Sequence, residues 1–224
     1  MRGKIALFVH QPKCSIQSVN GITQALSPYY DFKIFTKHEL EDDFFDDVDM
    51  VAFPGGFGDS DSWDYLLRSH VERIRGFIAN GGRYLGICMG AYWAGSDYFN
   101  ILDDIKIEQY ITRPNTCTRR PHAKAMEVDW LGNKEKMFFY DGCAIEGSNM
   151  DVVATYPNGD AMAIIQGNIG LIGCHPESQK HWYESYSWME KQWHHDTHKR
   201  YLLDFVDGLM NNGSVAELGL MQQS

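Results

Sequence analysis

Short apolar runs alternate with amphipathic stretches over the first ninety residues. The runs are apolar at almost every position, which is typical of strands buried on both faces of a parallel sheet. Two stretches between them, 15–26 and 64–80, repeat apolar residues every three or four positions and predict helices. The apolar runs, predicted as strands, cover residues 4–10, 32–36, 50–53 and 83–87. This alternation indicates an α/β fold with a parallel sheet covered on both faces.

The pattern changes after residue 100. Short β-like pieces and then a β-meander replace the alternation, and two helices with aromatic stripes, over 179–194 and 197–211, follow. We expect these stripes to pack on the core or in a dimer. The predicted strands cover 105–111, 125–130, 136–140, 152–156, 161–166 and 169–173. The sequence therefore predicts one domain over 1–224, with a β-rich insertion at about 100–147 and a helical appendage at about 178–212.

Composition narrows the choice of partner and compartment. The 224 residues carry a net charge of −10, which argues against a nucleic acid or an anionic membrane as the main partner. Five cysteines occur without a Cys-x-x-Cys pair, so reduced thiols and a cytoplasmic protein are expected. The first apolar run is also too short for a signal peptide or a membrane span.

Cys88 is the first candidate for chemistry. It stands in Gly-Ile-Cys-Met-Gly (86–90), between an apolar strand and a stretch of small residues. The spacing predicts a sharp strand-to-helix turn, in which flanking glycines allow close packing and the helix N-terminus favours the reactive thiolate. A buried structural cysteine is the alternative interpretation.

A second candidate motif is His175-Pro176-Glu177, which follows the apolar run at 169–173. Residues two apart in an extended segment point to the same side, so Glu177 is placed to orient the imidazole of His175. A thiol paired with a base that a carboxylate orients is the arrangement that nucleophilic catalysis needs.

Together these residues resemble the class I glutamine amidotransferase-like superfamily, through Pro54-Gly55-Gly56, Cys88 and His175-Pro176-Glu177. Within it, the chain is most similar to the biotin-protein ligase N-terminal group. The stretches that carry this narrower resemblance are 53–56, 81–92, 153–156 and 167–177. The resemblance implies a flavodoxin-like, doubly wound sheet, with the chain as a free-standing relative that lacks the ligase catalytic region.

The resemblance also implies roles for individual residues. Cys88 would be the nucleophile, His175 the base and Glu177 its orienting group. Backbone N–H groups of Met89 and of the Gly55-Gly56 turn would form the oxyanion hole. Glutamine-hydrolysing members usually hold the substrate amide with a glutamine where this chain has Tyr92, and a phenol cannot reproduce an amide's paired donor and acceptor. Tyr92 is thus a substrate-binding candidate that places glutamine as the substrate in doubt.

Three weaker signals remain. Arg113, Arg119, Arg120, His122 and Lys124 form a basic segment in an acidic chain. It is either a solvated loop or a site for an anionic substrate group. His194, His195 and His198 include a pair four residues apart, but without companion carboxylates or cysteines they predict no metal site. Asp59 is expected to cap the helix that follows it.

The leading hypothesis is a cysteine hydrolase or amidotransferase-like enzyme without a cofactor, acting on a small amide or peptide. Any enzyme that accepts the ammonia would be a separate chain. The alternative is a regulatory module that binds a metabolite or a partner protein and needs neither His175 nor Glu177 for chemistry. A redox sensor built on Cys88 is a third possibility, which would require a resolving thiol such as Cys14 nearby.

Overall fold

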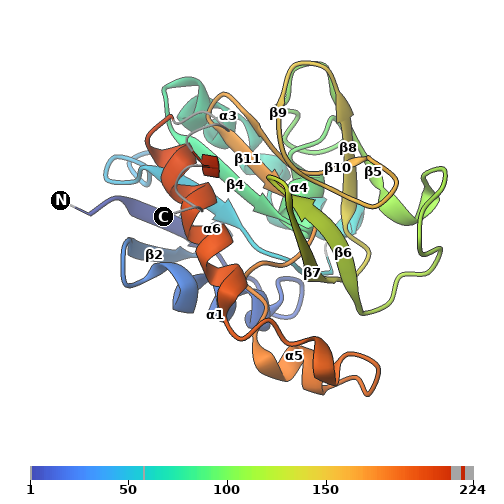
Figure 1. Ribbon diagram of the computed structural model, residues 1–224. Helices are drawn as coiled ribbons and strands as arrows, with labels where there is room; N and C mark the ends of the chain where they lie inside the picture. The colour runs from blue at the N-terminus through green and yellow to red at the C-terminus, as the bar shows by residue number, and fades with distance from the viewer. Residues whose placement is uncertain (1, 58, 213–217, 220–224) are drawn as a thin grey trace.

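A computed structural model describes residues 2–57, 59–212 and 218–219. Eleven strands in these residues form one sheet (Figure 1). Five of them run parallel, in the order β2-β1-β3-β4-β11. They are β1 (Lys4–Phe8), β2 (Asp31–Phe35), β3 (Met50–Phe53), β4 (Arg83–Ile87) and β11 (Ile169–Ile172). This is the strand order of flavodoxin-like folds, with β11 in the fifth place, so the predicted fold class is confirmed.

The second half of the sheet is antiparallel and continues from β11 through β10, β9, β6 and β7, with β8 pairing to β10 and β5. Its strands are β5 (Ile105–Gln109), β6 (Lys124–Trp130), β7 (Asn133–Phe139), β8 (Cys143–Gly147), β9 (Asp151–Thr155) and β10 (Ala161–Gln166). The sequence pattern missed β8, which is short and ends in an exposed Glu-Gly pair. This half brings the β7–β8 connection up to the end of β11.

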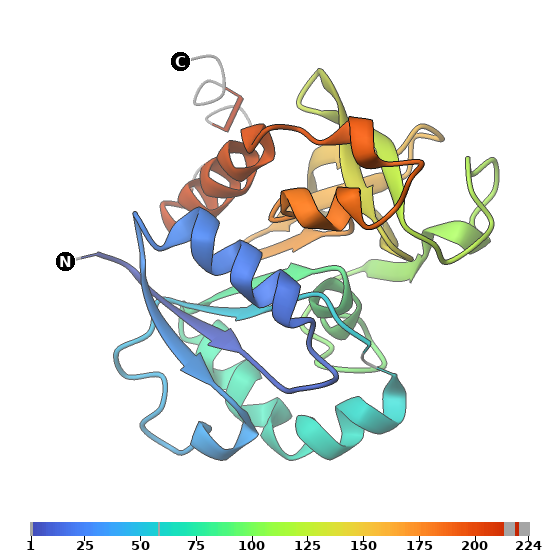
Figure 2. The same cartoon turned by 90° about the horizontal axis from the view of Figure 1, so that it is seen from below.

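Helices cover both faces of the parallel half. Figure 2 shows α1 (Ile16–Leu26) and α6 (Thr197–Met210) on one face, and α2 (Ser60–Leu66) and α3 (Val71–Ala79) on the other. Each face has its own buried apolar cluster. The short helices are α4 (Met89–Trp93) and α5 (Lys180–Glu184), with 3₁₀ turns η1 (Lys37–Glu39), η2 (Arg68–His70), η3 (Tyr110–Thr112) and η4 (Glu190–Gln192). The predicted cap is confirmed, because the Asp59 carboxylate accepts from the Ser62 amide at 2.8 Å.

Two helix predictions were wrong in extent. The helix expected over 64–80 breaks at Leu67, where φ is −131°. Leu66 and Leu67 are both buried at this break, at 1% and 0% exposure. The helix expected over 179–194 likewise divides into α5 and η4. There the adjacent residues Trp182 and Tyr183 both pack into a small cluster with Phe138.

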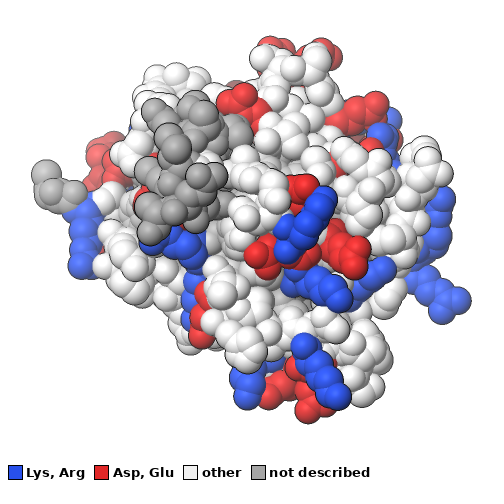
Figure 3. Space-filling view, viewed as in Figure 1, with Lys and Arg blue, Asp and Glu red and all other residues white. Residues whose placement is uncertain are grey.

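Figure 3 shows lysine, arginine, aspartate and glutamate side chains interspersed on one face, with no large area of a single sign. Ion pairs join many charged side chains of the described residues, as Lys134 with Asp129 at 2.7 Å. Within the residues that the structure describes, no helix is both long enough and apolar enough to cross a membrane.

Candidate functional site

Cys88 lies in the predicted sharp turn between β4 and α4, with φ 51° and ψ −103°. Its amide donates to the carbonyl of Ile172 on β11 at 2.8 Å. A Cβ on Gly86 would lie 2.4 Å from the Gly90 carbonyl oxygen, and one on Gly90 would lie 2.0 Å from that of Phe53. The strained φ of Cys88 is therefore held by packing that only glycine permits on either side.

His175 follows β11, whose residue Ile172 pairs in parallel with Ile87 of β4. Cys88 and His175 thus come from the carboxyl ends of adjacent parallel strands, where open α/β sheets place their sites. The imidazole Nδ1 donates to Glu177 Oε1 at 2.7 Å. The two residues are buried, at 5% and 0% exposure, and the amide of His175 donates to the Phe138 carbonyl at 2.8 Å.

Cys88 lies close enough to His175 to affect the protonation of the imidazole. Burial opposes a charge on His175, but the Glu177 carboxylate and Cys88 outweigh burial and raise the pKa of the imidazole to about 10. The Cys88 sulfur also lies 3.7 Å from the carbonyl oxygen of Tyr140. The structure therefore brings together the three side chains that the sequence singled out, and it favours a proton on the imidazole.

Ser18 belongs to the same hydrogen-bond network, and the sequence analysis missed it. Its hydroxyl donates to Glu177 Oε1 at 2.7 Å and accepts from the Gly55 amide at 3.0 Å. Ser18 is fully buried on α1. One feature of the sequence points to Ser18. It lies four residues before Ile22, which puts its polar side chain on the buried face of an amphipathic helix.

The Gly55-Gly56 turn follows β3 and packs against the site. A Cβ on Gly55 would lie 2.6 Å from His175 Cε1, and one on Gly56 would lie 2.1 Å from the carbonyl oxygen of Lys13. The Gly55 amide is already bonded to Ser18. The amides of Gly56 and Met89 donate no hydrogen bond to another described residue. Of the N–H groups expected in an oxyanion hole, these two remain available.

A cavity of about 560 Å³ opens beside Cys88. The Tyr92 hydroxyl does not point freely into it but donates to the Asp141 carbonyl at 2.9 Å, and burial raises its pKa far above the ordinary value. Tyr92 therefore serves as a wall and a brace for the β7–β8 connection. The lining residues are Gly56, Phe57, Asp59, Cys88, Met89, Tyr92, Tyr98, Gln109, Tyr140 and Asp141.

The basic segment does not line this cavity. Arg113 instead bonds to three carboxylates, those of Glu108, Glu146 and Asp160. Lys124 donates to the carbonyl of Cys117 at 3.2 Å. Over the described residues, the carboxylate contacts of this segment are those of Arg113, while Lys124 and Arg119 bond to backbone carbonyls.

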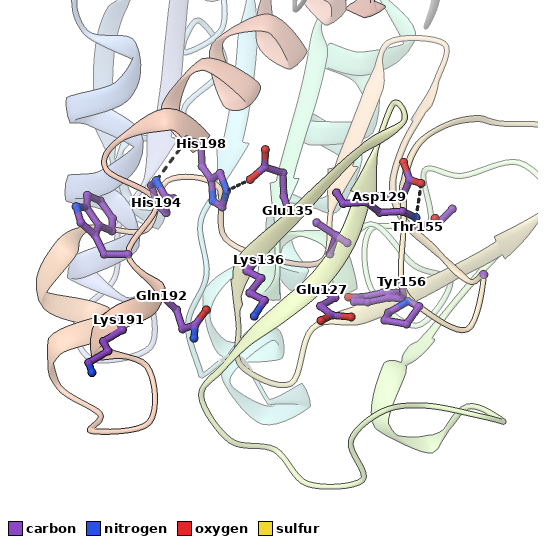
Figure 4. Close-up of a pocket in the computed structure, with 15 residues that line it drawn as sticks. Glu127, Asp129, Glu135, Lys136, Thr155, Tyr156, Lys191, Gln192, His194 and His198 are labelled. Atoms are coloured by element: carbon purple, nitrogen blue, oxygen red, sulfur yellow. Dashed lines mark hydrogen bonds and ion pairs between the residues drawn. The ribbon is translucent and has the colours of Figure 1, made fainter.

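His194 and His198 line a different hollow of about 820 Å³ (Figure 4). Their rings stack with centroids 3.9 Å apart. The amide of His198 donates to His194 Nδ1 at 3.3 Å, and His198 Nε2 donates to Glu135 Oε2 at 3.1 Å. Over the described residues, no group of three or more His, Cys, Asp or Glu side chains is arranged to hold a metal ion.

The other thiols near the site are poorly suited to redox exchange. Cys14 and Cys174 are buried, at 1% and 0% exposure. Burial raises the pKa of Cys14 to about 12 despite the opposing hydrogen bond with the His10 backbone. Burial also raises the pKa of Cys174, which lies in the core as its alternation with His175 predicts. A resolving thiolate at Cys14 is therefore disfavoured.

Solved structures with the same fold include several glutamine amidotransferases. One is 14% identical with a TM-score of 0.63 and covers 92% of this chain and 98% of its own. A second, from Thermotoga maritima, is 14% identical with a TM-score of 0.60 and covers 100% of both chains. A third, from Methylobacillus flagellatus, is 12% identical with a TM-score of 0.56 and covers 99% and 94%. At these identities the likeness establishes the fold alone, which this chain shares with these glutamine amidotransferases.

The narrower resemblance comes from the sequence. Residues 10–113 match the family described as biotin-protein ligase, N terminal. The chain is therefore similar to that group within the glutamine amidotransferase-like fold, as its motifs predict. No curated protein matches the sequence.

Proposed function

We propose that the chain is a cysteine-dependent hydrolase or amidotransferase-like enzyme that acts on an amide or related acyl substrate. The observation that carries this proposal is the placement of Cys88 beside His175, whose imidazole bonds to Glu177, at the ends of adjacent strands and next to a cavity. A structural cysteine needs neither an oriented base nor a cavity.

In the proposed reaction, the His175 imidazole already holds the proton, and the Cys88 thiolate attacks the carbonyl carbon. The amides of Gly56 and Met89 stabilise the oxyanion, and such a donor is worth about 3 kcal/mol in the transition state. The C–N bond then breaks, His175 returns the proton to the leaving amine, and a thioester remains on Cys88. Water hydrolyses the thioester with His175 as base, while Glu177 holds the imidazole tautomer throughout.

The test is the pH dependence of Cys88 alkylation by iodoacetamide in wild type, His175→Ala and Glu177→Gln. Labelling is followed by mass spectrometry of the Cys88 peptide, because Cys117 is an exposed thiol that will also react. Labelling of Cys88 at neutral pH that falls in both variants supports the proposal. The same preparation is then screened with amides, glutamine included, for a thioester trapped on Cys88.

A regulatory binding module is the second candidate, supported by the match of residues 10–113 to the biotin-protein ligase N-terminal family. For such a module, Cys88 would be inert or indifferent to His175, and no amide would acylate it. That outcome would overturn the enzymatic proposal.

A further inference from the structure

The cavity beside Cys88 has an unbalanced charge. No lysine, arginine or histidine lines it, but two aspartates, Asp59 and Asp141, do. Asp59 is occupied at the rim, where it caps α2 and lies 3.6 Å from the ammonium of Lys13. Asp141 has no cationic partner among the described residues. The one uncompensated charge on the cavity wall is therefore a carboxylate.

Asp141 is held in place by its backbone conformation and by two hydrogen bonds. Its φ is 54°, in the left-handed region. Its carbonyl accepts from the Tyr92 hydroxyl at 2.9 Å, and its Oδ2 accepts from Gln109 Nε2 at 3.0 Å. Its Oδ1 is buried and has no hydrogen-bond partner among the described residues. An unsatisfied buried carboxylate oxygen costs free energy, and a positive ligand in the cavity would stabilise this carboxylate through its charge.

The rest of the wall suits a cation as well. Four aromatic residues, Phe57, Tyr92, Tyr98 and Tyr140, line the same cavity. Aromatic faces attract ammonium groups, and the attraction grows where the cation is desolvated. An anionic group would instead meet two carboxylates and several ring faces, none of which stabilises negative charge.

We infer that Asp141 is a specificity-determining residue that selects amide or acyl substrates bearing a positively charged amine close to the scissile carbonyl. This inference rests on the proposed function of Cys88. It also gives a physical reason to doubt glutamine, because the α-carboxylate of glutamine would find no lysine, arginine or histidine among the described residues that line the cavity. An aminoacyl amide or a peptide with a free amino terminus carries the amine without a nearby carboxylate.

The test uses two thiol reagents of similar size and opposite charge, aminoethyl and sulfonatoethyl methanethiosulfonate. The Cys88 thiolate displaces methanesulfinate from either reagent and forms a mixed disulfide. Rates are measured on the full-length chain by mass spectrometry of the Cys88 peptide, in a Cys117→Ser background. They are divided by the rates of the same reagents with free cysteine, so that only the protein's contribution remains.

We expect the cationic reagent to label Cys88 at least ~10-fold faster than the anionic one, within the range of electrostatic steering. Asp141→Asn should abolish most of this preference. Asparagine tolerates the left-handed backbone and can still accept from Gln109, so the variant is expected to fold. Glu190→Gln, an exposed charge change away from the cavity, is the control and should keep the preference.

Equal corrected rates in wild type, or a preference that survives in Asp141→Asn, would overturn the inference. Since the wild-type ratio is informative alone, misfolding of the variant does not block the test. The outcomes also distinguish the enzyme proposal for Cys88 from the charge selectivity inferred for Asp141. If neutral iodoacetamide labelling depends on His175 but charge has no effect, the enzyme proposal stands and the selectivity is wrong. If no reagent reaches Cys88, both are overturned.

Discussion

The Ser18 hydroxyl donates to Glu177 Oε1 at 2.7 Å, although the two residues are 159 positions apart in the chain. The same hydroxyl accepts from the amide of Gly55 at 3.0 Å. One buried side chain thereby connects α1, the turn after β3 and the carboxylate that holds His175. The placement of the imidazole relative to the Gly55-Gly56 turn depends on this bond.

Ser18→Ala tests that dependence. The substitution leaves the Gly55 amide without a partner and removes one of the two donors to Glu177 Oε1, so we expect a loss of about 1–3 kcal/mol in the free energy of unfolding. Alkylation of Cys88 at neutral pH should also slow several-fold. Asn20→Ala, an exposed change on the same helix, should stay within about 0.5 kcal/mol of wild type. Urea titrations compare the variants, and equal stabilities would contradict the role of Ser18.

His175 should make stability fall at alkaline pH. Its pKa rises from 6.5 to about 10, because Glu177 and Cys88 outweigh the opposing effect of burial. A raised pKa means that the folded state binds the proton more tightly than the unfolded state. The stabilisation is therefore fully present below pH 6.5 and is lost as the pH rises through about 10.

The measurement is the urea midpoint of wild type and His175→Gln at several pH values between these limits. Wild type should lose more stability across the interval than the variant, in which this proton is missing. His181→Gln removes an exposed histidine and should reproduce the wild-type slope. Parallel curves for wild type and His175→Gln would show that the imidazole is not protonated in the folded protein.

Gly55→Ala should disturb the site more than the fold. The added Cβ would lie 2.6 Å from His175 Cε1, so the imidazole must move, at an expected cost of about 1–3 kcal/mol. Cys88 alkylation at neutral pH should slow with it. At Gly76, in α3, a Cβ meets nothing within 4 Å, and Gly76→Ala should stabilise the chain by about 0.5–1 kcal/mol. Unchanged labelling in Gly55→Ala would show that the ring has room to shift.

Much of the fold could be read from local pattern. The parallel strands and α1 and α6 were predictable because their apolar spacing matches their burial, and the turn at Cys88 because glycines mark the close approaches around it. The breaks at Leu67 and within 179–194 could not be predicted, since apolar residues keep helical spacing on both sides of each break. The strand β8 was missed because its polar end gives little periodicity.

The candidate site was predictable only in part, and the reason is physical. Cys88, His175 and Glu177 are marked by their own neighbours in the sequence. Ser18 and Asp141 gain their roles from residues that are distant along the chain, Glu177 for the first and Tyr92 for the second. No local pattern encodes such pairings. The basic segment is the opposite case, a local pattern that predicts a role the structure does not support. Its member Arg113 forms ion pairs with carboxylates that lie elsewhere in the sequence.

Tyr92→Phe should loosen the β7–β8 connection. The variant removes the hydroxyl that donates to the Asp141 carbonyl at 2.9 Å, and we expect a loss of about 1 kcal/mol in the free energy of unfolding. Tyr140, whose carbonyl lies 3.7 Å from the Cys88 sulfur, belongs to the same connection. Faster hydrogen exchange at residues 140–142 would confirm that Tyr92 braces it. Exchange equal to wild type would assign Tyr92 to the cavity wall alone.

His194 should make the chain sensitive to acid. Burial, followed by the neighbouring His198, lowers its pKa from 6.5 to about 3. The ring uses one nitrogen as acceptor from the His198 amide and the other as donor to the Ser178 carbonyl at 3.2 Å, as a neutral imidazole does. The folded state thus binds this proton less readily than the unfolded state. Stability is full above about pH 6.5 and falls as the pH drops toward 3.

His194→Phe keeps the stacked ring but removes the titration. At neutral pH the variant should be less stable by about 1–2 kcal/mol, because the Ser178 carbonyl and the His198 amide lose their partner. On acidification to about pH 4.5, wild type should lose more stability than the variant, so the gap between them narrows. His195→Asn is the control, since His195 is exposed and asparagine tolerates its φ of 51°. A gap that stays constant from neutral to acidic pH would show that His194 takes up its proton without unfolding.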